Sequence, residues 1–172
     1  MSPLTARSVS MALVGGVAAV LLYSQGFLVW PALIAWAAFL DAGGDSAAFK
    51  RTITGNAFGA GLAWITLVIS LSVAVADEGQ MWIPRTGLTI AISLLILVLA
   101  SRVTALSRVS LSIYGYAAVF GAYILAIEGR TALQGLTGAH LNNPLVLVVI
   151  SMVAGAVCGL ASNRLADALA KK

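Results

Sequence analysis

Residues 9–40 read VSMALVGGVAAVLLYSQGFLVWPALIAWAAFL and contain no charged side chain. An α-helix rises 1.5 Å per residue, so a single straight helix over this stretch would be about 48 Å long. The hydrocarbon core of a membrane is only about 30 Å thick. The polar residues 24–26 (SQG) divide the stretch. We therefore predict a membrane hairpin, with one span at about 9–24 and a second at about 27–41.

The composition of the whole chain also indicates a membrane protein. Hydrophobic residues make up 60% of the 172 residues and charged residues 9%, and the mean hydropathy is +1.00. A soluble domain has about a quarter of its residues charged. The basic residues stand singly or in pairs at the ends of apolar runs, so we expect no nucleic-acid binding. One cysteine (Cys158) and one histidine (His140) are too few for a structural zinc site, and we expect no metal and no cofactor.

Further apolar runs complete the predicted fold. We expect an all-α bundle of six transmembrane helices in a single integral membrane domain, residues 1–172. The apolar character resumes at Phe27, which favours a retained first span over a cleaved signal peptide. The remaining predicted spans lie at about 54–76, 86–101, 109–127 and 143–163.

The distribution of Lys and Arg predicts the orientation of the spans. Eight basic residues lie on one side of a six-span chain and two on the other, Arg85 and Arg130. Basic residues concentrate on the cytoplasmic side, so we expect both termini in the cytoplasm. A rival five-span reading, with residues 9–40 as one tilted helix, gives seven against three. The eight residues are Arg7, Lys50, Arg51, Arg102, Arg108, Arg164, Lys171 and Lys172.

The two halves of the chain, about 9–76 and 86–163, resemble each other. With an offset of 84 residues, three aromatic residues of the second span align with three of the fifth. After a one-residue gap, GDSA at 44–47 matches GRTA at 129–132, and Thr52 matches Thr137. Three spans per half is an odd number, so the halves would be inverted relative to one another, as in many transporters and channels. The aligned pairs are Trp30 with Tyr114, Trp36 with Phe120 and Phe39 with Tyr123.

The aromatic residues of these two spans are candidate pore residues. Tyr116, Phe120 and Tyr123 share a face of the fifth span at helical spacing, and Trp36 and Phe39 share the matching face of the second. Such a face, lined with hydroxyl groups, would form a narrow neck for small polar or neutral molecules. The alternative interpretation is ordinary packing or lipid contact.

Amide side chains near the start of the third span of each half are further candidates. Asn56 in the first half and Asn142 or Asn143 in the second would present hydrogen-bonding groups to a solute, with helix capping as the alternative. No carboxylate lies at a span centre, and Asp41 and Glu128, at span ends, come closest. Because no ionisable group lies at a span centre, proton-coupled pumping is disfavoured.

Glycines spaced by four allow helices to approach closely in membranes. Two such pairs occur, one in the third span and one in the sixth, and we predict that they pack helices within a subunit or between subunits. A homo-oligomer is expected. The predicted packing glycines are Gly55, Gly59, Gly121, Gly155 and Gly159.

The order of these features carries a family resemblance. A first hairpin leads to FLVW at 27–30 and AWAAF at 35–39, followed by the glycine-rich turn DAGG at 41–44 and a second half with glycines in its last two spans. In this the chain resembles a family of small bacterial inner-membrane proteins typified by YcdZ, a domain of unknown function. The resemblance implies six spans and a bacterial inner membrane, and it brings no established activity.

These observations favour a channel or facilitator for a small polar or neutral solute, with the lipid bilayer as the other partner. Two alternatives stay open: an ion-coupled secondary transporter using Asp41 or Glu128, and a scaffold or accessory subunit without transport. We do not expect an enzyme, because no constellation of catalytic residues lies at a common depth.

Overall fold

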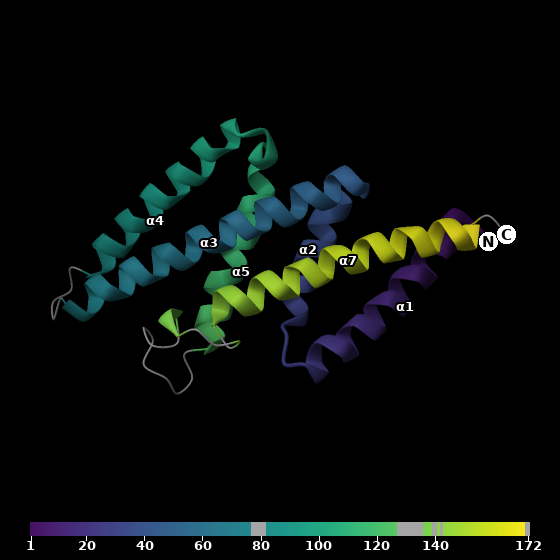
Figure 1. Ribbon diagram of the computed structural model, residues 1–172, viewed down its shortest axis with the longest axis horizontal. Helices are drawn as coiled ribbons and strands as arrows, with labels where there is room; N and C mark the ends of the chain where they lie inside the picture. The colour runs from purple at the N-terminus through teal and green to yellow at the C-terminus, as the bar shows by residue number, and fades with distance from the viewer. Residues whose placement is uncertain (77–81, 127–135, 139–140, 142, 171–172) are drawn as a thin grey trace. The chain divides into compact units, whose positions relative to one another are not determined.

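The computed structural model describes all residues except 77–81, 127–135, 139–140, 142 and 171–172. Every regular element within the described residues is helical, which confirms the predicted all-α class for that part of the chain (Figure 1). Two short 3-10 helices, Ala100–Arg102 and Thr104–Leu106, follow α4. The α-helices are α1 (Pro3–Ser24), α2 (Val29–Asp41), α3 (Ser46–Ala76), α4 (Trp82–Leu99), α5 (Val109–Ala126) and α7 (Pro144–Ala170).

Several helices are suited to a membrane. Four are long and apolar enough to cross one: α1, α3, α4 with its continuation to Arg102, and α7. Helices α2 and α5 are also apolar, but their apolar segments, Val29–Asp41 and Val109–Ile124, are shorter. The chain therefore has the helices of a membrane protein, while the count of six spans stays a prediction.

The first apolar stretch folds as two helices, so the single-helix reading of residues 9–40 is wrong. Helix α1 ends at Ser24 and α2 begins at Val29. Gly26 takes a positive φ of 74° in the turn, a backbone conformation that glycine adopts without strain. The N–H of Phe27 donates to the carbonyl of Leu22 at 2.8 Å and closes the end of α1. Helix α1 also starts earlier than predicted, because Ser2 caps it and Pro3 opens it.

The α2–α3 turn is fixed by local hydrogen bonds. Gly43 and Gly44 have φ values of 119° and 69°. Asp45 caps α3, its Oδ1 accepting from the N–H of Ala48 at 2.6 Å. The guanidinium of Arg51 donates to the carbonyl of Ala42 at 3.3 Å, at the end of α2. From Asp45 the helix continues without a break, so the predicted third span is the later part of one longer helix.

Helix α7 begins at Pro144, close to the prediction, and continues to Ala170, seven residues beyond the predicted end at 163. Its last turns carry Asn163 and Asp167, so the extension is a polar continuation of an apolar helix.

The chain forms two compact units. Unit 1 contains residues 1–53 and 150–172, and unit 2 contains residues 54–149. Unit 1 therefore holds α1, α2 and most of α7, whereas unit 2 holds α4, α5 and most of α3. Each unit combines the first two helices of one predicted half with the third helix of the other half.

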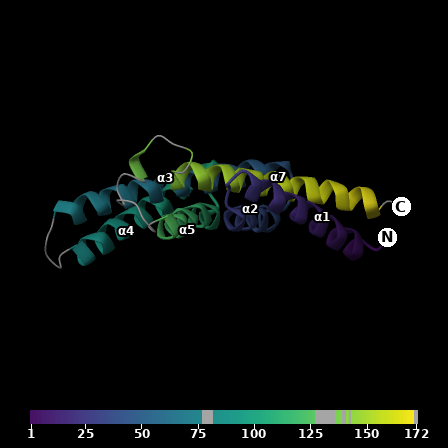
Figure 2. The ribbon, with the colours of Figure 1, turned by 90° about the horizontal axis from the view of Figure 1, so that it is seen from below.

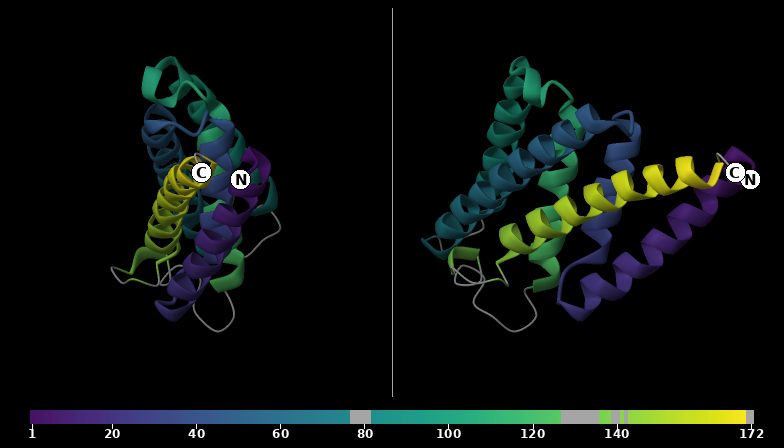
Figure 3. Two further views of the ribbon diagram at one scale, coloured as in Figure 1. Left: turned by 90° about the vertical axis from the view of Figure 1, so that its right-hand side faces the viewer. Right: turned by 45° about the vertical axis from the view of Figure 1, so that its right-hand side comes forward.

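In unit 1, hydrogen bonds tie α7 to the amino-terminal helices. The buried Ser10 of α1 donates to the carbonyl of Ser162, and the two hydroxyl oxygens lie 2.9 Å apart. The N–H of Leu28, at the start of α2, donates to Ser151 Oγ at 3.0 Å. Figure 2 and Figure 3 show the first turns of α1 beside the last turns of α7.

Glycines let α7 cross α2 closely within unit 1 (Figures 1 and 3). A Cβ at Gly155 would overlap the carbonyl of Ala32, and one at Gly159 would collide with the rings of Phe39 and Trp36. The two helices are therefore in backbone contact at Gly155 and in ring contact at Gly159.

Helices α1 and α4 expose most of their apolar surface. Only 11% of the apolar window of each is buried. Large contiguous apolar surfaces are rare on soluble monomers, so these faces fit contact with lipid chains. The exposed side chains include Leu13, Val17 and Val20 on α1 and Leu88, Ile92 and Leu95 on α4.

Candidate polar site on helices α3 and α5

Helices α3 and α5 cross in unit 2 with their backbones in contact (Figure 1). A Cβ at Gly59 would overlap the carbonyl oxygen of Ser112, and a Cβ at Gly115 would overlap the carbonyl oxygen of Asn56. The contact is therefore reciprocal, each helix offering a glycine to a carbonyl of the other. Such Cα–H···O approaches recur where small residues join membrane helices. At Gly55, one turn away, a Cβ would lie 2.7 Å from Leu111 Cβ.

Two buried polar side chains at this α3–α5 crossing have no protein partner. Asn56 is 3% exposed and Ser112 is 1% exposed. Within the described residues, no hydrogen-bond partner meets Asn56 Nδ2, Asn56 Oδ1 or Ser112 Oγ. Leaving a buried polar group unsatisfied costs about 1–3 kcal/mol. The amide therefore offers one acceptor and one two-hydrogen donor to any molecule that reaches it.

Thr52 is a further buried polar residue of α3, and it belongs to unit 1. It stands four residues before Asn56, hence on the same side of the helix, and it is fully buried. Its hydroxyl has no hydrogen-bond partner in the described part of the chain. A helical threonine usually bonds the carbonyl four residues earlier, as Thr66 does with Leu62 at 2.7 Å. The Thr52 hydroxyl makes no such hydrogen bond within the described residues.

The tyrosine nearest the crossing is, by contrast, satisfied. Tyr116 Oη lies 2.7 Å from Ser93 Oγ of α4. The hydroxyl hydrogen of Ser93 goes to the carbonyl of Ile90 at 2.8 Å, so Tyr116 is the donor in the pair. Its ring stacks on Phe120, with centroids 5.1 Å apart and planes at 28°. Tyr123 is half-buried further along α5.

The other predicted site residues lie in separate surroundings. Trp36 and Phe39 are buried in unit 1 beside Gly159, and Trp36 Nε1 has no partner among the described residues. Gly121 is half-buried on α5. Asn142 falls outside the described residues. Unit 2 thus brings together Asn56, Tyr116, Phe120 and Tyr123, and unit 1 holds Trp36, Phe39, Gly155 and Gly159.

Asn143, the alternative counterpart of Asn56, has a structural role. Its Nδ2 donates to the carbonyls of Leu136 at 2.6 Å and Gly138 at 3.2 Å. Its Oδ1 accepts from the N–H of Leu145 at 2.9 Å, which caps α7. Capping is therefore the interpretation that holds for this asparagine.

Sequence reasoning missed Thr52 and Ser112. Both could have been found from spacing, because each stands four residues before a candidate that was identified, Asn56 and Tyr116. Serine and threonine are common in membrane helices, however, where most bond their own backbone. Sequence spacing alone, without the hydrogen-bond pattern, does not distinguish Thr52 and Ser112 from the other Ser and Thr residues in the helices.

The chain as a whole matches a family described as a protein of unknown function, DUF1097, over residues 8–167. It belongs to the DUF1097 family. The match extends from the first turns of α1 to the last turns of α7, and it confirms the predicted membership of an uncharacterised family; the resemblance to YcdZ-type proteins stays a prediction. No curated protein and no solved structure matches the chain.

Proposed function

We propose that this protein is a passive channel or facilitator for a small, uncharged polar solute. The observation that carries the proposal is the buried, unpartnered amide of Asn56 at the α3–α5 crossing. An amide that contacts a passing solute needs free hydrogen-bonding capacity, and a structural amide such as that of Asn143 has none left.

The chemistry of the surroundings suggests the class of solute. No charged residue occurs between Arg51 and Asp77, which spans nearly all of α3. An ion would find no opposite charge along residues 52–76 of this helix, and stripping its water is expensive. A neutral molecule carrying both a donor and an acceptor, such as urea or a short amide, matches the amide of Asn56 and the hydroxyl of Ser112. The backbone contact at Gly59 and Gly115 favours a small molecule.

The composition of the two units supports a three-plus-three inverted repeat as part of this proposal. In each unit a glycine-bearing third helix crosses the short second helix of the other half, α7 across α2 and α3 across α5. Transport sites in inverted repeats form near the midplane from such matched helices. Six spans and an excess of basic residues at the termini favour an inner-membrane protein with both ends in the cytoplasm.

The test is stopped-flow light scattering on proteoliposomes challenged with water, glycerol, urea, acetamide or a small carboxylate. We expect faster relaxation for a neutral donor–acceptor solute and its loss in Asn56→Leu. Gly61→Ala is the matched control on the same helix, because a Cβ at Gly61 meets nothing within 4 Å. No acceleration for any solute, in vesicles that hold folded protein, would exclude a passive pore.

The same vesicles address the two alternatives. Flux that depends on a proton or sodium gradient and is lost in Asp41→Asn would favour coupled transport. An absence of flux together with a stably co-purifying partner would favour a scaffold. Neither alternative draws support from a contact of the described residues.

A further inference from the structure

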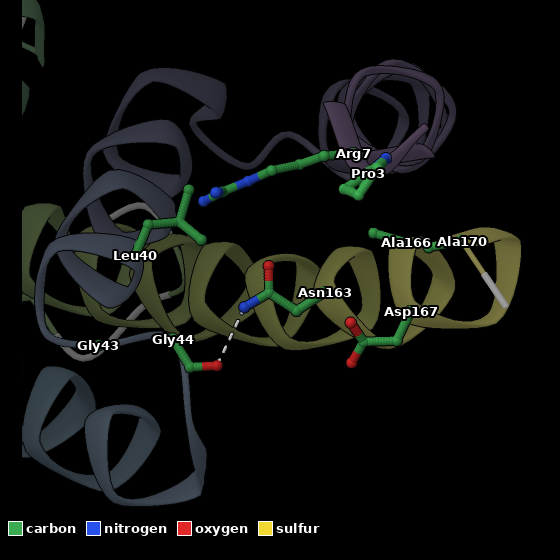
Figure 4. Close-up of a pocket in the computed structure, with 9 residues that line it drawn as sticks. All are labelled: Pro3, Arg7, Leu40, Gly43, Gly44, Asn163, Ala166, Asp167 and Ala170. Atoms are coloured by element: carbon green, nitrogen blue, oxygen red, sulfur yellow. Dashed lines mark hydrogen bonds between the residues drawn. The ribbon is translucent and has the colours of Figure 1, made fainter. Parts of the chain in front are cut away.

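A polar cavity lies at the end of unit 1 where α1 begins and α7 ends (Figure 4). Its volume is about 390 Å³, within the range of small-ligand sites, roughly 300–1,000 Å³. The α2–α3 turn forms a third side through Gly43 and Gly44, and three polar side chains line it: Arg7, Asn163 and Asp167.

A hydrogen bond from α7 holds the α2–α3 turn in place at the cavity. Asn163 Nδ2 donates to the carbonyl of Gly44 at 3.0 Å. A Cβ at Gly44 would stand 2.7 Å from that nitrogen, so a glycine is needed there for the contact as well as for the positive φ. Figure 4 shows the amide oxygen of Asn163 turned away from Gly44, toward the side from which Arg7 enters. The amide oxygen of Asn163 can therefore accept a hydrogen bond from a ligand in the cavity.

The cavity carries one cation and one anion that do not neutralise each other. Arg7 reaches in from α1 toward Leu40, while Asp167 lies one turn beyond Asn163 on α7 (Figure 4). Within the described part of the chain, neither Arg7 nor Asp167 has an ion-pair or hydrogen-bond partner. The carbonyl end of α2 adds partial negative charge at Gly43.

We propose that this cavity binds a phosphate–ammonium ligand, and that the ligand is the headgroup of a zwitterionic phospholipid. The guanidinium of Arg7 would hold the phosphate through paired N–H···O bonds, which suit its planar fork. The ammonium group would lie near the Asp167 carboxylate, with the Asn163 amide oxygen as a further acceptor.

The position of the cavity favours a lipid over a soluble ligand. Arg7 stands directly before the apolar run of α1, at the level where basic residues meet headgroups. Beyond it, α1 exposes the apolar side chains of Met11, Leu13 and Val17, against which acyl chains can lie. This site does not depend on the proposed transport activity, because it belongs to unit 1 and uses none of the groups at the α3–α5 crossing.

Native mass spectrometry of the full chain in detergent tests the proposal. The probes are a phosphatidylethanolamine, a phosphatidylglycerol of the same chains, and soluble glycerophosphoethanolamine. We expect tightest binding of phosphatidylethanolamine, and a loss of roughly ten- to a hundredfold in Arg7→Gln, as for removal of a charge-assisted hydrogen bond. Arg164→Gln is the matched control: it removes the same charge from an exposed position of α7 that does not line the cavity.

A second variant separates headgroup recognition from general attraction. Asp167→Asn should weaken phosphatidylethanolamine binding and leave phosphatidylglycerol binding unchanged or stronger. Equal effects of Arg7→Gln and Arg164→Gln, or no change in lipid preference in Asp167→Asn, would overturn the proposal. Binding of the soluble headgroup as tightly as the lipid would overturn the lipid as the source. Arg7 and Asp167 are exposed, so both variants should keep the melting temperature of the parent protein.

Discussion

Substituting Asn56 by leucine should make this protein more stable and less active. The two side chains have the same branched shape, so the change replaces two polar atoms with methyl groups and little else. Asn56 is 3% exposed, and its amide atoms have no partner among the described residues. Removing an unsatisfied buried amide recovers about 1–3 kcal/mol. The same amide is the group that we propose meets the solute, so flux should fall while the free energy of unfolding rises.

Asn143→Leu is the same change of side chain, but we expect it to lower the stability of the protein. The Asn143 amide makes three hydrogen bonds, to the carbonyls of Leu136 and Gly138 and from the N–H of Leu145. At about 0.5–1.5 kcal/mol each, their loss should cost about 1.5–4.5 kcal/mol. The two variants therefore differ in the sign of their effect on stability, although each removes one asparagine from unit 2.

Thermal unfolding of the purified protein in detergent measures both variants. For a chain of this size, 1 kcal/mol shifts the melting temperature by roughly 2–4 °C. We expect a rise for Asn56→Leu, a fall for Asn143→Leu, and in proteoliposomes a loss of flux for the first. A fall in the melting temperature of Asn56→Leu comparable with that of Asn143→Leu would refute the reasoning, because it would show that the Asn56 amide is already satisfied within the protein.

Further predictions concern packing, a buried pair and topology. Gly59→Ala should destabilise the protein by about 1–3 kcal/mol through overpacking. Gly61→Ala should be neutral or stabilising by up to about 1 kcal/mol. Thermal unfolding compares the two variants, and equal shifts in melting temperature would contradict the backbone contact at Gly59. Ser93→Ala should cost about 1–3 kcal/mol because it leaves the Tyr116 hydroxyl buried without its acceptor, and restoration of stability by adding Tyr116→Phe would confirm the cause. A reporter fused after Lys172 that is active only in the cytoplasm should be active, and an inactive, stably made fusion would reverse the proposed orientation.

Much of the helix pattern could be predicted from the sequence, because a membrane helix is specified by length and apolar composition. The break after Ser24 and the start of α5 at Val109 follow directly from where polar residues interrupt apolar runs. The structure differs at the starts of α1, α3 and α4 and at the end of α7, where the helices extend beyond the predicted apolar spans. There the length is set by capping and by packing, such as the Asp45 cap, and hydropathy does not record either.

The partners of the helices could not be predicted. The glycines of α3 and α7 indicate that another helix packs closely against each of them. They do not indicate which helix, because any small-residue face fits any other in an apolar medium. Nothing in the spacing of Gly155 names Ala32 as its neighbour. The sequence does not indicate the cavity of unit 1 for a different reason. In the sequence Arg7 is explained by topology alone, and Asn163 and Asp167 join it only because α7 returns to the start of the chain.

The return of α7 to the amino-terminal helices has a consequence for biosynthesis. The hydrogen bonds that complete unit 1 join residues 152, 123 and 119 positions apart, in the pairs Ser10–Ser162, Leu28–Ser151 and Gly44–Asn163. At about 5–20 residues per second, a ribosome needs roughly 6–30 s to make the roughly 120–150 residues between such partners. During that time the nascent hairpin of α1 and α2 lacks the helix that covers it. The insertion machinery or lipid must shelter the Ala32 and Trp36 face until the last helix is released, and a chain truncated before α7 would leave that face open to degradation.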